Sequence, residues 1–323
     1  MCGPQISVVI PVYNEEDVLP LTIERLLAAL ALVDFELIFV DDGSLDSSMT
    51  LLAESAVKDN RVKVVALSRN FGHQAAISAG LHSSSGEAVV LIDADLQDPP
   101  ELIPEMMALW KQGFEVVNGI RTHRKGESWP KRVAAHTFYR YLRRNSEVNL
   151  PVDIGDFKLL SRKVVDVLNL MPERQLYMRG MSAWVGFKQV GIEYVRDPRA
   201  AGISKYPWAK SIKLSIVALT SFSVTPLKWL LKLAALVAGV AFVASVWVIF
   251  AKMFYHVSNQ SVPGWTSLLV VVLWLGSAQL AGLAVIGAYI AQIAEQVRGR
   301  PPYIVSGTIN LGPRGLEAHS GGD

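Results

Sequence analysis

The sequence predicts an α/β protein in which a mostly parallel, doubly wound sheet precedes a membrane-spanning C-terminal part. Three observations predict it. Short apolar strands alternate with amphipathic helices up to about residue 125, polar clusters follow several of the strands, and two long uncharged segments lie near the C-terminus. Continuous Val/Ile/Leu strands that alternate with helices are typical of parallel sheets covered on both faces.

The N-terminal alternation places strands and helices in a regular order. The expected strands are Ile6–Ile10, Glu36–Val40, Arg61–Leu67, Glu87–Ile92 and Glu115–Asn118. Helical periodicity between them predicts helices over Leu19–Leu32 and Met49–Val57. Because ligands bind beyond the carboxyl ends of the strands in such sheets, the residues after each strand are the first candidates for a functional site.

Polar clusters follow three of the apolar runs. They are "VVIPVYNEE", "FVDDGSLDSS" and "LIDADLQDPP". The chain contains neither G-x-x-x-x-G-K-[ST] nor G-x-G-x-x-G, which argues against a P-loop kinase or a Rossmann dehydrogenase. A nucleotide bound here would therefore need carboxylates and a metal ion to hold its phosphates.

Asp93 and Asp95 are the candidate metal-site carboxylates, because they end a buried strand where no helix start requires two acids. Two like charges about 4 Å apart repel by about 4 kcal/mol at an effective dielectric constant near 20, so a cation is expected beside them. Mg²⁺ accepts one or two carboxylates and completes its shell with substrate phosphates. Gln97 could add a neutral oxygen ligand.

Other polar residues in these clusters have a structural interpretation. Asp98-Pro99-Pro100-Glu101 has the form of a helix start, with Asp98 at the N-cap and Glu101 in the first turn. Asp46 is placed to cap the helix over Ser47–Val57, and Asn14 to cap the first helix. These residues are expected to serve the fold rather than the chemistry.

The two uncharged segments run from Leu233 to Ala251 and from Val257 to Ala294. About 20 residues of helix span a bilayer core of about 30 Å. They predict transmembrane helices over Trp229–Lys252 and Trp265–Ala294; the alternative is two buried helices of a soluble core, which rarely stay apolar on every side. Within the second helix, Ala278/Gly282, Ala284/Ala288 and Gly287/Ala291 favour close helix contact, in one chain or between chains.

Charges set the expected topology. Lys228 and Lys232 precede the first span, and Arg298 and Arg300 follow the second, which places both flanks in the cytoplasm and the short loop outside. No signal peptide is expected before the first strand, so residues 1 to about 205 are expected to stay on the cytoplasmic side. The lone Cys2 excludes an internal disulfide and fits a reducing compartment.

A basic segment rich in aromatic residues follows the last expected strand. Its basic residues are Arg121, Arg124, Lys125, Lys131, Arg132, Arg140, Arg143 and Arg144. With membrane spans in the same chain, an amphipathic helix on anionic lipid headgroups is favoured over a plain solvated helix or a nucleic-acid site. Tyr206–Val224 is expected to form a second interfacial helix.

An ordered set of motifs resembles a known family. The motifs are "VVIPVYNEE", "VDDGS", "DADLQDPP", "GIR", "GDFKLL" and "SKY". They resemble the inverting glycosyltransferases of the dolichol-phosphate mannose synthase type, in particular bacterial glucosyl and aminoarabinosyl transferases that act on undecaprenyl phosphate. The resemblance covers residues 5–305. It implies a GT-A fold, a nucleotide-sugar donor (UDP-glucose favoured), a polyprenyl phosphate acceptor, Mg²⁺ or Mn²⁺, and a homo-oligomer such as a tetramer.

The resemblance also implies roles for single residues. The implied nucleotide-sugar site is Pro11, Tyr13, Glu15, Val40, Asp42, Asp93, Ala94, Asp95, Arg121, Arg199 and Lys205. Asp95 and Gln97 match metal ligands, and the implied catalytic residues are Asp93, Arg121 and Asp156, the last near the acceptor. A phosphate with a second pKa of about 6 is already largely ionised at pH 7. Asp156 is therefore expected to orient the acceptor or to screen the sugar carbon more than it removes a proton.

Two alternatives remain. A processive polysaccharide synthase would carry Q-x-x-R-W and more spans; the nearest stretch, "RQLYMRG", has Gln175 and Arg179 at a different spacing and no Trp. An inactive membrane scaffold would have lost Asp93, Asp95 or Arg121, and all three are present. The expected order is a cytoplasmic catalytic domain (1–205), an interfacial helix (206–228), a first span (229–252), an external loop (253–264), a second span (265–294) and a cytoplasmic tail (295–323).

Overall fold

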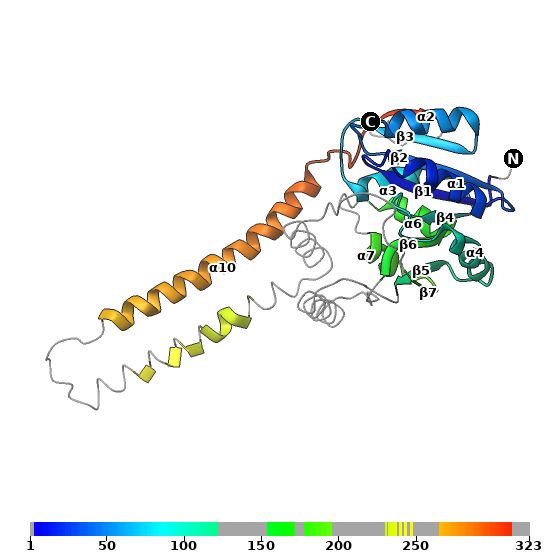
Figure 1. Cartoon of the computed structure of the whole chain (residues 1–323). Helices are drawn as coiled ribbons and strands as arrows, with labels where there is room; N and C mark the ends of the chain where they lie inside the picture. The colour runs from blue at the N-terminus through cyan, green and yellow to red at the C-terminus, as the bar shows by residue number, and fades with distance from the viewer. Residues whose placement is uncertain are drawn as a thin grey trace, which may run out of the picture. The chain divides into compact units, whose positions relative to one another are not determined.

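The expected sheet is present in the computed structural model, which describes residues 3–121, 154–171, 178–195 and 265–311 and short stretches between 230 and 247 (Figure 1). The chain divides into two compact units. The sheet unit contains the chain up to Ile212, apart from 145–147, and again from Arg300 onward. The helical unit contains Lys213–Gly299 together with 145–147.

The described strands form one mixed eight-stranded sheet in the order β7-β5-β6-β4-β1-β2-β3-β8. The strands are β1 (Ile6–Val12), β2 (Phe35–Asp41), β3 (Val62–Leu67), β4 (Ala88–Leu91), β5 (Val116–Arg121), β6 (Ile154–Ser161), β7 (Gln189–Tyr194) and β8 (Val305–Ile309). β6 and β8 pair antiparallel with their neighbours, and the other pairs are parallel. The expectation of a mostly parallel sheet is confirmed, with two antiparallel exceptions.

The strands expected from the apolar runs are β1 to β5, and their ends move by three residues or fewer. Every residue of β1 and β2 is buried, as suits strands near the middle of the sheet. The sequence analysis did not anticipate β6, β7 or β8. β6 contains the charged residues Asp156 and Lys158, so its sequence does not look like a buried strand.

Helices cover both faces of the sheet. They are α1 (Leu19–Ala29), α2 (Ser48–Lys58), α3 (His73–Ser83), η1 (Pro100–Leu102), α4 (Ile103–Lys111), α6 (Arg162–Leu170) and α7 (Met178–Trp184). Successive strand residues point to opposite faces. α1, α2 and α4 pack on the face that carries Val8 and Ile10. α3 lies on the other face, so close that a Cβ on Gly80 would sit 2.2 Å from Val9 Cγ1.

The strand order creates a switch point between β1 and β4. The chain proceeds outward from β1 through β2 to β3 and then returns to the other side of β1 as β4. In doubly wound sheets this position, at the carboxyl ends of the strands, is where ligands bind. The fold therefore places the residues after β1 and β4 where a site is expected.

Two of the expected helix caps differ from the structure. α1 begins at Leu19 with Val18 before it, whereas Asn14 Oδ1 accepts a hydrogen bond from Leu45 N at 2.8 Å, so the expectation that Asn14 caps α1 is wrong. Asp46 does support the start of α2, because its Oδ1 accepts from Ser48 N at 3.0 Å. Asn14 has a positive φ of 52°, and its side chain links two loops instead of one helix end.

Asp98 is the other wrong cap. No side-chain cap bond begins η1 or α4. Asp98 is instead fully buried, with partners on β5 and β7 that are described with the site. Glu101 has a structural role, since it forms a bidentate ion pair with Arg25 on α1.

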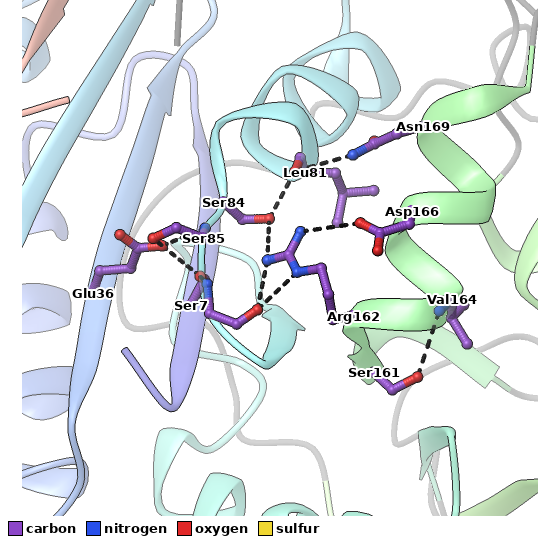
Figure 2. Close-up of polar contacts among 11 residues, drawn as sticks. Ser7, Glu36, Leu81, Ser84, Ser85, Ser161, Arg162, Val164, Asp166 and Asn169 are labelled. Atoms are coloured by element: carbon purple, nitrogen blue, oxygen red, sulfur yellow. Dashed lines mark hydrogen bonds and ion pairs between the residues drawn. The ribbon is translucent and has the colours of Figure 1, made fainter. Parts of the chain in front are cut away.

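A network of polar side chains joins the amino ends of the strands (Figure 2). Glu36 Oε1 on β2 accepts from Ser7 Oγ at 2.5 Å and from Ser85 N at 2.7 Å, and Glu36 Oε2 pairs with Lys63. Arg162, at the start of α6, donates to the carbonyl oxygen of Gly86 through Nε at 2.8 Å. The network ties β1, β2 and α6 to the loop before β4.

The helical unit contains α10 (Trp265–Val297), 33 residues long. Its segment Trp274–Ala291 is long and apolar enough to cross a membrane, with a mean hydropathy of 1.4, and is the one such segment within the described residues. Most of its large side chains are exposed, and Trp274 is 75% exposed. This agrees with the second expected span, whereas the first, over 229–252, falls largely outside the described residues and stays a prediction.

Gly282 on α10 is buried against Leu230, a residue of the first expected span. A Cβ on Gly282 would lie 2.9 Å from Leu230 Cδ1. The small residue at this position therefore permits close packing within the chain. No such contact lies within 4 Å of Gly287 among the described residues, so oligomerisation through the other small residues stays a prediction.

After α10 the chain returns to the sheet unit as β8, antiparallel to β3. Asn310 Nδ2, just beyond the strand, donates to the carbonyl oxygens of Ala56 at 2.6 Å and Val62 at 2.9 Å. Residues expected only as a cytoplasmic tail thus include an edge strand. The run is short and contains Ser and Gly, so its sequence gives a weak strand signal.

Candidate active site

Most of the predicted site residues lie where the carboxyl ends of the parallel strands meet, at the carboxyl edge of the sheet. Tyr13 and Glu15 follow β1, Asp42 follows β2, and Asp93 and Asp95 follow β4. Since β6 runs in the opposite direction, its beginning reaches the same edge and brings Asp156 there. The other predicted residues of this edge are Pro11 and Val40, which are buried opposite each other in β1 and β2, and Arg121, which ends β5.

Strand register brings Asp93 and Asp156 together. β4 and β6 pair antiparallel with Leu91 opposite Lys158. Continuing this register by two residues sets Asp93 opposite Asp156. Residues directly opposite each other in an antiparallel pair have neighbouring side chains. The carboxylates of Asp93 and Asp156 are therefore neighbours although they are far apart in the sequence.

His73 lies between these two carboxylates. It is the first residue of α3, and its Nε2 is 3.5 Å from Asp93 Oδ1 and 3.7 Å from Asp156 Oδ2. The sequence analysis missed it. The rule that polar residues after apolar strands reach the carboxyl edge also applies to "SRNFGHQ" after β3, and that signal could have identified His73.

Asp93 is strongly affected by its surroundings. Its side chain is 27% exposed, and burial raises its pKa to about 6; His73 opposes that rise, and the carboxylates of Asp156, Asp98 and Asp95 add to it. A raised carboxyl pKa means that the negative charge is disfavoured there. Burial, more than the neighbouring acids, therefore disfavours the charged form of Asp93.

Asp42 fixes the loop that leads to His73. Its Oδ1 accepts from Phe71 N at 2.7 Å, and its Oδ2 accepts from Gly72 N at 2.9 Å. Burial nevertheless raises the pKa of Asp42 above its ordinary value. Gly72 has a φ of 103°, a conformation that favours glycine. Both oxygens of Asp42 are engaged by the chain, so a contact with the base or ribose stays a proposal.

Arg121 is anchored by the carboxylate that the sequence assigned to a helix cap. Its NH2 lies 3.3 and 3.4 Å from the two oxygens of Asp98, and its Nε donates to Tyr194 Oη at 3.1 Å. Tyr194 Oη in turn donates to Asp98 Oδ1. A fully buried carboxylate requires such a cation and donors, which outweigh the local preference for a cap.

Gly155 on β6 makes room for this arginine. A Cβ at that position would lie 2.7 Å from Arg121 NH2. The guanidinium therefore packs on the strand backbone next to Asp156. Burial and the neighbouring Asp98 raise the pKa of Tyr194 far above its ordinary value, which keeps the hydroxyl protonated and donating.

Lys158 is a buried basic residue outside the predicted site. It is fully buried, and its Nζ donates to Ser182 Oγ on α7 at 2.9 Å. Alternation along β6 places it on the same face as Asp156. The motif "GDFKLL" thus contributes both an acid and a base to one face of the sheet.

Asp95 and Gln97 form the tight turn that could hold a divalent cation. Asp95 Oδ1 accepts from Gln97 N at 3.2 Å, and Leu96 between them has a φ of 56°. Within the described residues, no group of three or more His, Cys, Asp or Glu is arranged to hold a metal ion. One carboxylate and one amide oxygen, completed by substrate phosphates, fit Mg²⁺ or Mn²⁺ rather than a metal held by protein alone.

Other predicted site residues have different positions. Ala94 is buried, and its carbonyl oxygen accepts from Thr22 Oγ1 on α1 at 2.8 Å. Arg199 and Lys205 lie outside the described residues. The same holds for the basic segment after Arg121 and for the expected interfacial helix over Tyr206–Val224. Their parts in a site stay predictions.

The chain is similar to a known family and to several named proteins. The family model "Glycosyl transferase family 2" matches residues 7–168. The chain is 46% identical over 303 residues to the uncharacterized glycosyltransferase YkcC of Bacillus subtilis, covering 93% of each chain. It is 39% identical to the SfII prophage-derived bactoprenol glucosyl transferase of Shigella flexneri, covering 93% of this chain and 97% of that one. Among solved structures, mannosyltransferase PcManGT from Pyrobaculum calidifontis in complex with GDP-Man and Mn²⁺ matches 91% of this chain and 87% of its own, with a TM-score of 0.48 and 16% identity.

Proposed function

The chain belongs to glycosyl transferase family 2, and from this premise we propose that it transfers one glucosyl residue from UDP-glucose to undecaprenyl phosphate. It is a glycosyltransferase. The choice of acceptor and sugar is supported by relatives named bactoprenol glucosyl transferases, which match over 93% of this chain. The observation that carries the proposal is the meeting of Asp93, Asp95 and Asp156 at one edge of the sheet.

On the donor side, the chain's residues hold the diphosphate. Asp95 and Gln97 would bind Mg²⁺ or Mn²⁺, which stabilises the negative charge of the departing nucleoside diphosphate. Asp93 lies beside this turn, where the sugar ring follows the diphosphate. Arg121, held by Asp98 and Tyr194, keeps a positive charge near the same edge, and Arg199 and Lys205 are proposed to add to it.

On the acceptor side, Asp156 orients the lipid phosphate. A phosphate oxygen attacks the anomeric carbon from the face opposite the diphosphate, so a bond to the phosphate oxygen forms as the bond to the nucleoside diphosphate breaks. The configuration at that carbon is inverted. An ionised phosphate has no proton to lose at this step, so no strong general base is required.

The membrane part delivers the acceptor. The long prenyl tail stays in the bilayer, and the apolar segment Trp274–Ala291 of α10 is suited to anchor the chain there. We propose two spans with the sheet unit and both termini on the cytoplasmic side. The basic segment after Arg121 and the helix over Tyr206–Val224 would lie on the headgroups.

The test uses the full chain in detergent with undecaprenyl phosphate and a panel of labelled nucleotide sugars, with and without EDTA. We expect UDP-glucose to give one lipid-linked sugar that mild acid releases, and EDTA to abolish its formation until Mg²⁺ or Mn²⁺ is added. A long acid-stable polymer would indicate a processive synthase instead. No transfer from any donor would refute the proposed activity.

A further inference from the structure

We propose that His73 is a positioning residue for this sugar transfer: its imidazole bridges Asp93 and Asp156 and holds both carboxylates toward the place where donor sugar and acceptor phosphate meet. The proposal rests on the proposed function of the same site. It assigns a role to the first residue of α3, which none of the family motifs includes.

The geometry places one ring nitrogen between two carboxylates from different strands. His73 Nε2 is 3.5 Å from Asp93 Oδ1 and 3.7 Å from Asp156 Oδ2. Both separations are longer than a normal hydrogen bond, and contacts of this kind often tighten when substrate binds. The side chain is 32% exposed, so it borders the site and is not packed into the core.

The chain fixes the position of His73 from two sides. Asp42 binds the backbone N–H groups of Phe71 and Gly72, which sets the loop immediately before His73. Gly80, two turns along α3, packs directly on Val9 of β1 and so sets the distance of the helix from the sheet. The imidazole is therefore held by rigid elements, as a positioning group must be.

The needs of the helix do not explain a histidine here. The positive end of the helix dipole is at the N-terminus, so a basic residue in the first turn is unfavourable for the helix itself. His82 illustrates the structural alternative on the same helix. It lies in the last turn, where the dipole favours a basic group, and its Nδ1 is 2.9 Å from the carbonyl oxygen of Ser78. His73 has the opposite placement and faces two acids instead.

The bridge connects the two halves of the reaction. Asp93 follows β4 beside the donor turn, and Asp156 lies on β6 on the proposed acceptor side. Without the imidazole the two like charges would separate, and each would lose its orientation. The loss should therefore appear in the chemical step more than in donor binding.

The test measures kcat and the KM for UDP-glucose in full-length variants in detergent. We expect His73→Ala to lower kcat about tenfold to a hundredfold, as misplacement of a reacting group does, while the KM stays within about threefold. His73→Gln should recover part of the loss because it retains an N–H donor. His82→Ala, the matched control on the same helix, should leave both constants unchanged.

A double-mutant cycle separates positioning from a general structural effect. If His73 acts through Asp156, His73→Ala combined with Asp156→Asn should be no slower than Asp156→Asn alone within about twofold. Multiplying losses, or unchanged kcat in His73→Ala, would overturn the inference. If His73→Ala does not fold, His73→Gln replaces it in the cycle. Failure of the wild-type chain to transfer sugar would instead refute the proposed function.

Discussion

The two ends of the sheet use carboxylates in opposite ways. At the amino end, Glu36 is buried, but Ser7 and Ser85 donate to one of its oxygens (Figure 2). Lys63 pairs with the other oxygen. Burial alone would raise its pKa, yet these partners hold it below the ordinary value. At the carboxyl end, burial raises the pKa of Asp93 to about 6, and His73 offsets only part of the effect.

The difference supports placing the proposed site at the carboxyl end. A carboxylate whose charge is matched by the chain's own donors and cations contributes to stability. A carboxylate that lies beside other acids is instead stabilised when a cation or a hydrogen-bond donor binds to it. The surroundings of its carboxylates therefore distinguish the structural end of this sheet from the proposed reactive end, although acidic side chains occupy both.

Removing an acid from the reactive end should have the largest effect on activity. We expect Asp95→Asn to lower kcat by about 10³-fold, because the cation that stabilises the leaving diphosphate loses its charged ligand. Thermal unfolding should be unchanged or shifted upward, since like charges are removed. Activity near the wild-type level, measured with saturating Mg²⁺, would show that Asp95 is not a metal ligand.

Asp98 tests whether one carboxylate can contribute both to stability and to activity. Asp98→Asn removes the charge that anchors Arg121, so kcat should fall about tenfold to a hundredfold. The free energy of unfolding should also fall by about 1–3 kcal/mol, because Arg121 and Tyr194 lose a buried partner. Asp46→Asn offers a control in which a half-buried helix start, away from Arg121, is weakened. A loss confined to stability in Asp98→Asn would assign the residue to the fold alone.

Stability should respond with opposite signs at the two ends. At pH 7 we expect Glu36→Gln to destabilise the chain by about 1–3 kcal/mol and Asp93→Asn to stabilise it by up to about 3 kcal/mol. Asp93 binds more protons when folded than when unfolded between its ordinary pKa and about 6, so its destabilising charge disappears as the pH falls through this window. Glu36 has a lowered pKa, so its stabilisation is present above its ordinary pKa and is lost as the pH falls through the folded value.

Chemical unfolding of Glu36→Gln and Asp93→Asn at several pH values checks these two predictions. The gain from Asp93→Asn should be largest above pH 6 and should shrink toward pH 4. Equal signs for the two variants at pH 7 would break the comparison between the two ends of the sheet.

The smallest effect on stability is expected for Arg162, in the polar network at the amino ends of the strands. Arg162→Lys retains the charge but loses the guanidinium contacts with Gly86 O and Ser84 Oγ. We expect a loss of about 1 kcal/mol in unfolding free energy and no change in kcat. A marked change in kcat would show that the two ends are coupled, which the proposed separation of roles does not allow.

Local patterns predicted the parts of the fold that depend on local interactions. Apolar runs identified β1 to β5, and Asp46 was correctly expected at the start of α2. The errors arose where a local signal competed with a distant partner. Asp98 has the spacing of a helix cap, but Arg121 on β5 and Tyr194 on β7 bind it instead. β6 was missed because Asp156 and Lys158 resemble surface residues until their partners are known.

By itself, the sequence determined the family, the strand–helix alternation and the acidic turn after β4, because composition and spacing along the chain record these directly. Only the tertiary structure decided which charges meet. The register of β4 against β6 sets Asp93 beside Asp156, and the packing of α3 on β1 brings His73 to both. Such pairings depend on strand order and helix packing, which join residues far apart in the chain and leave no fixed spacing in the sequence.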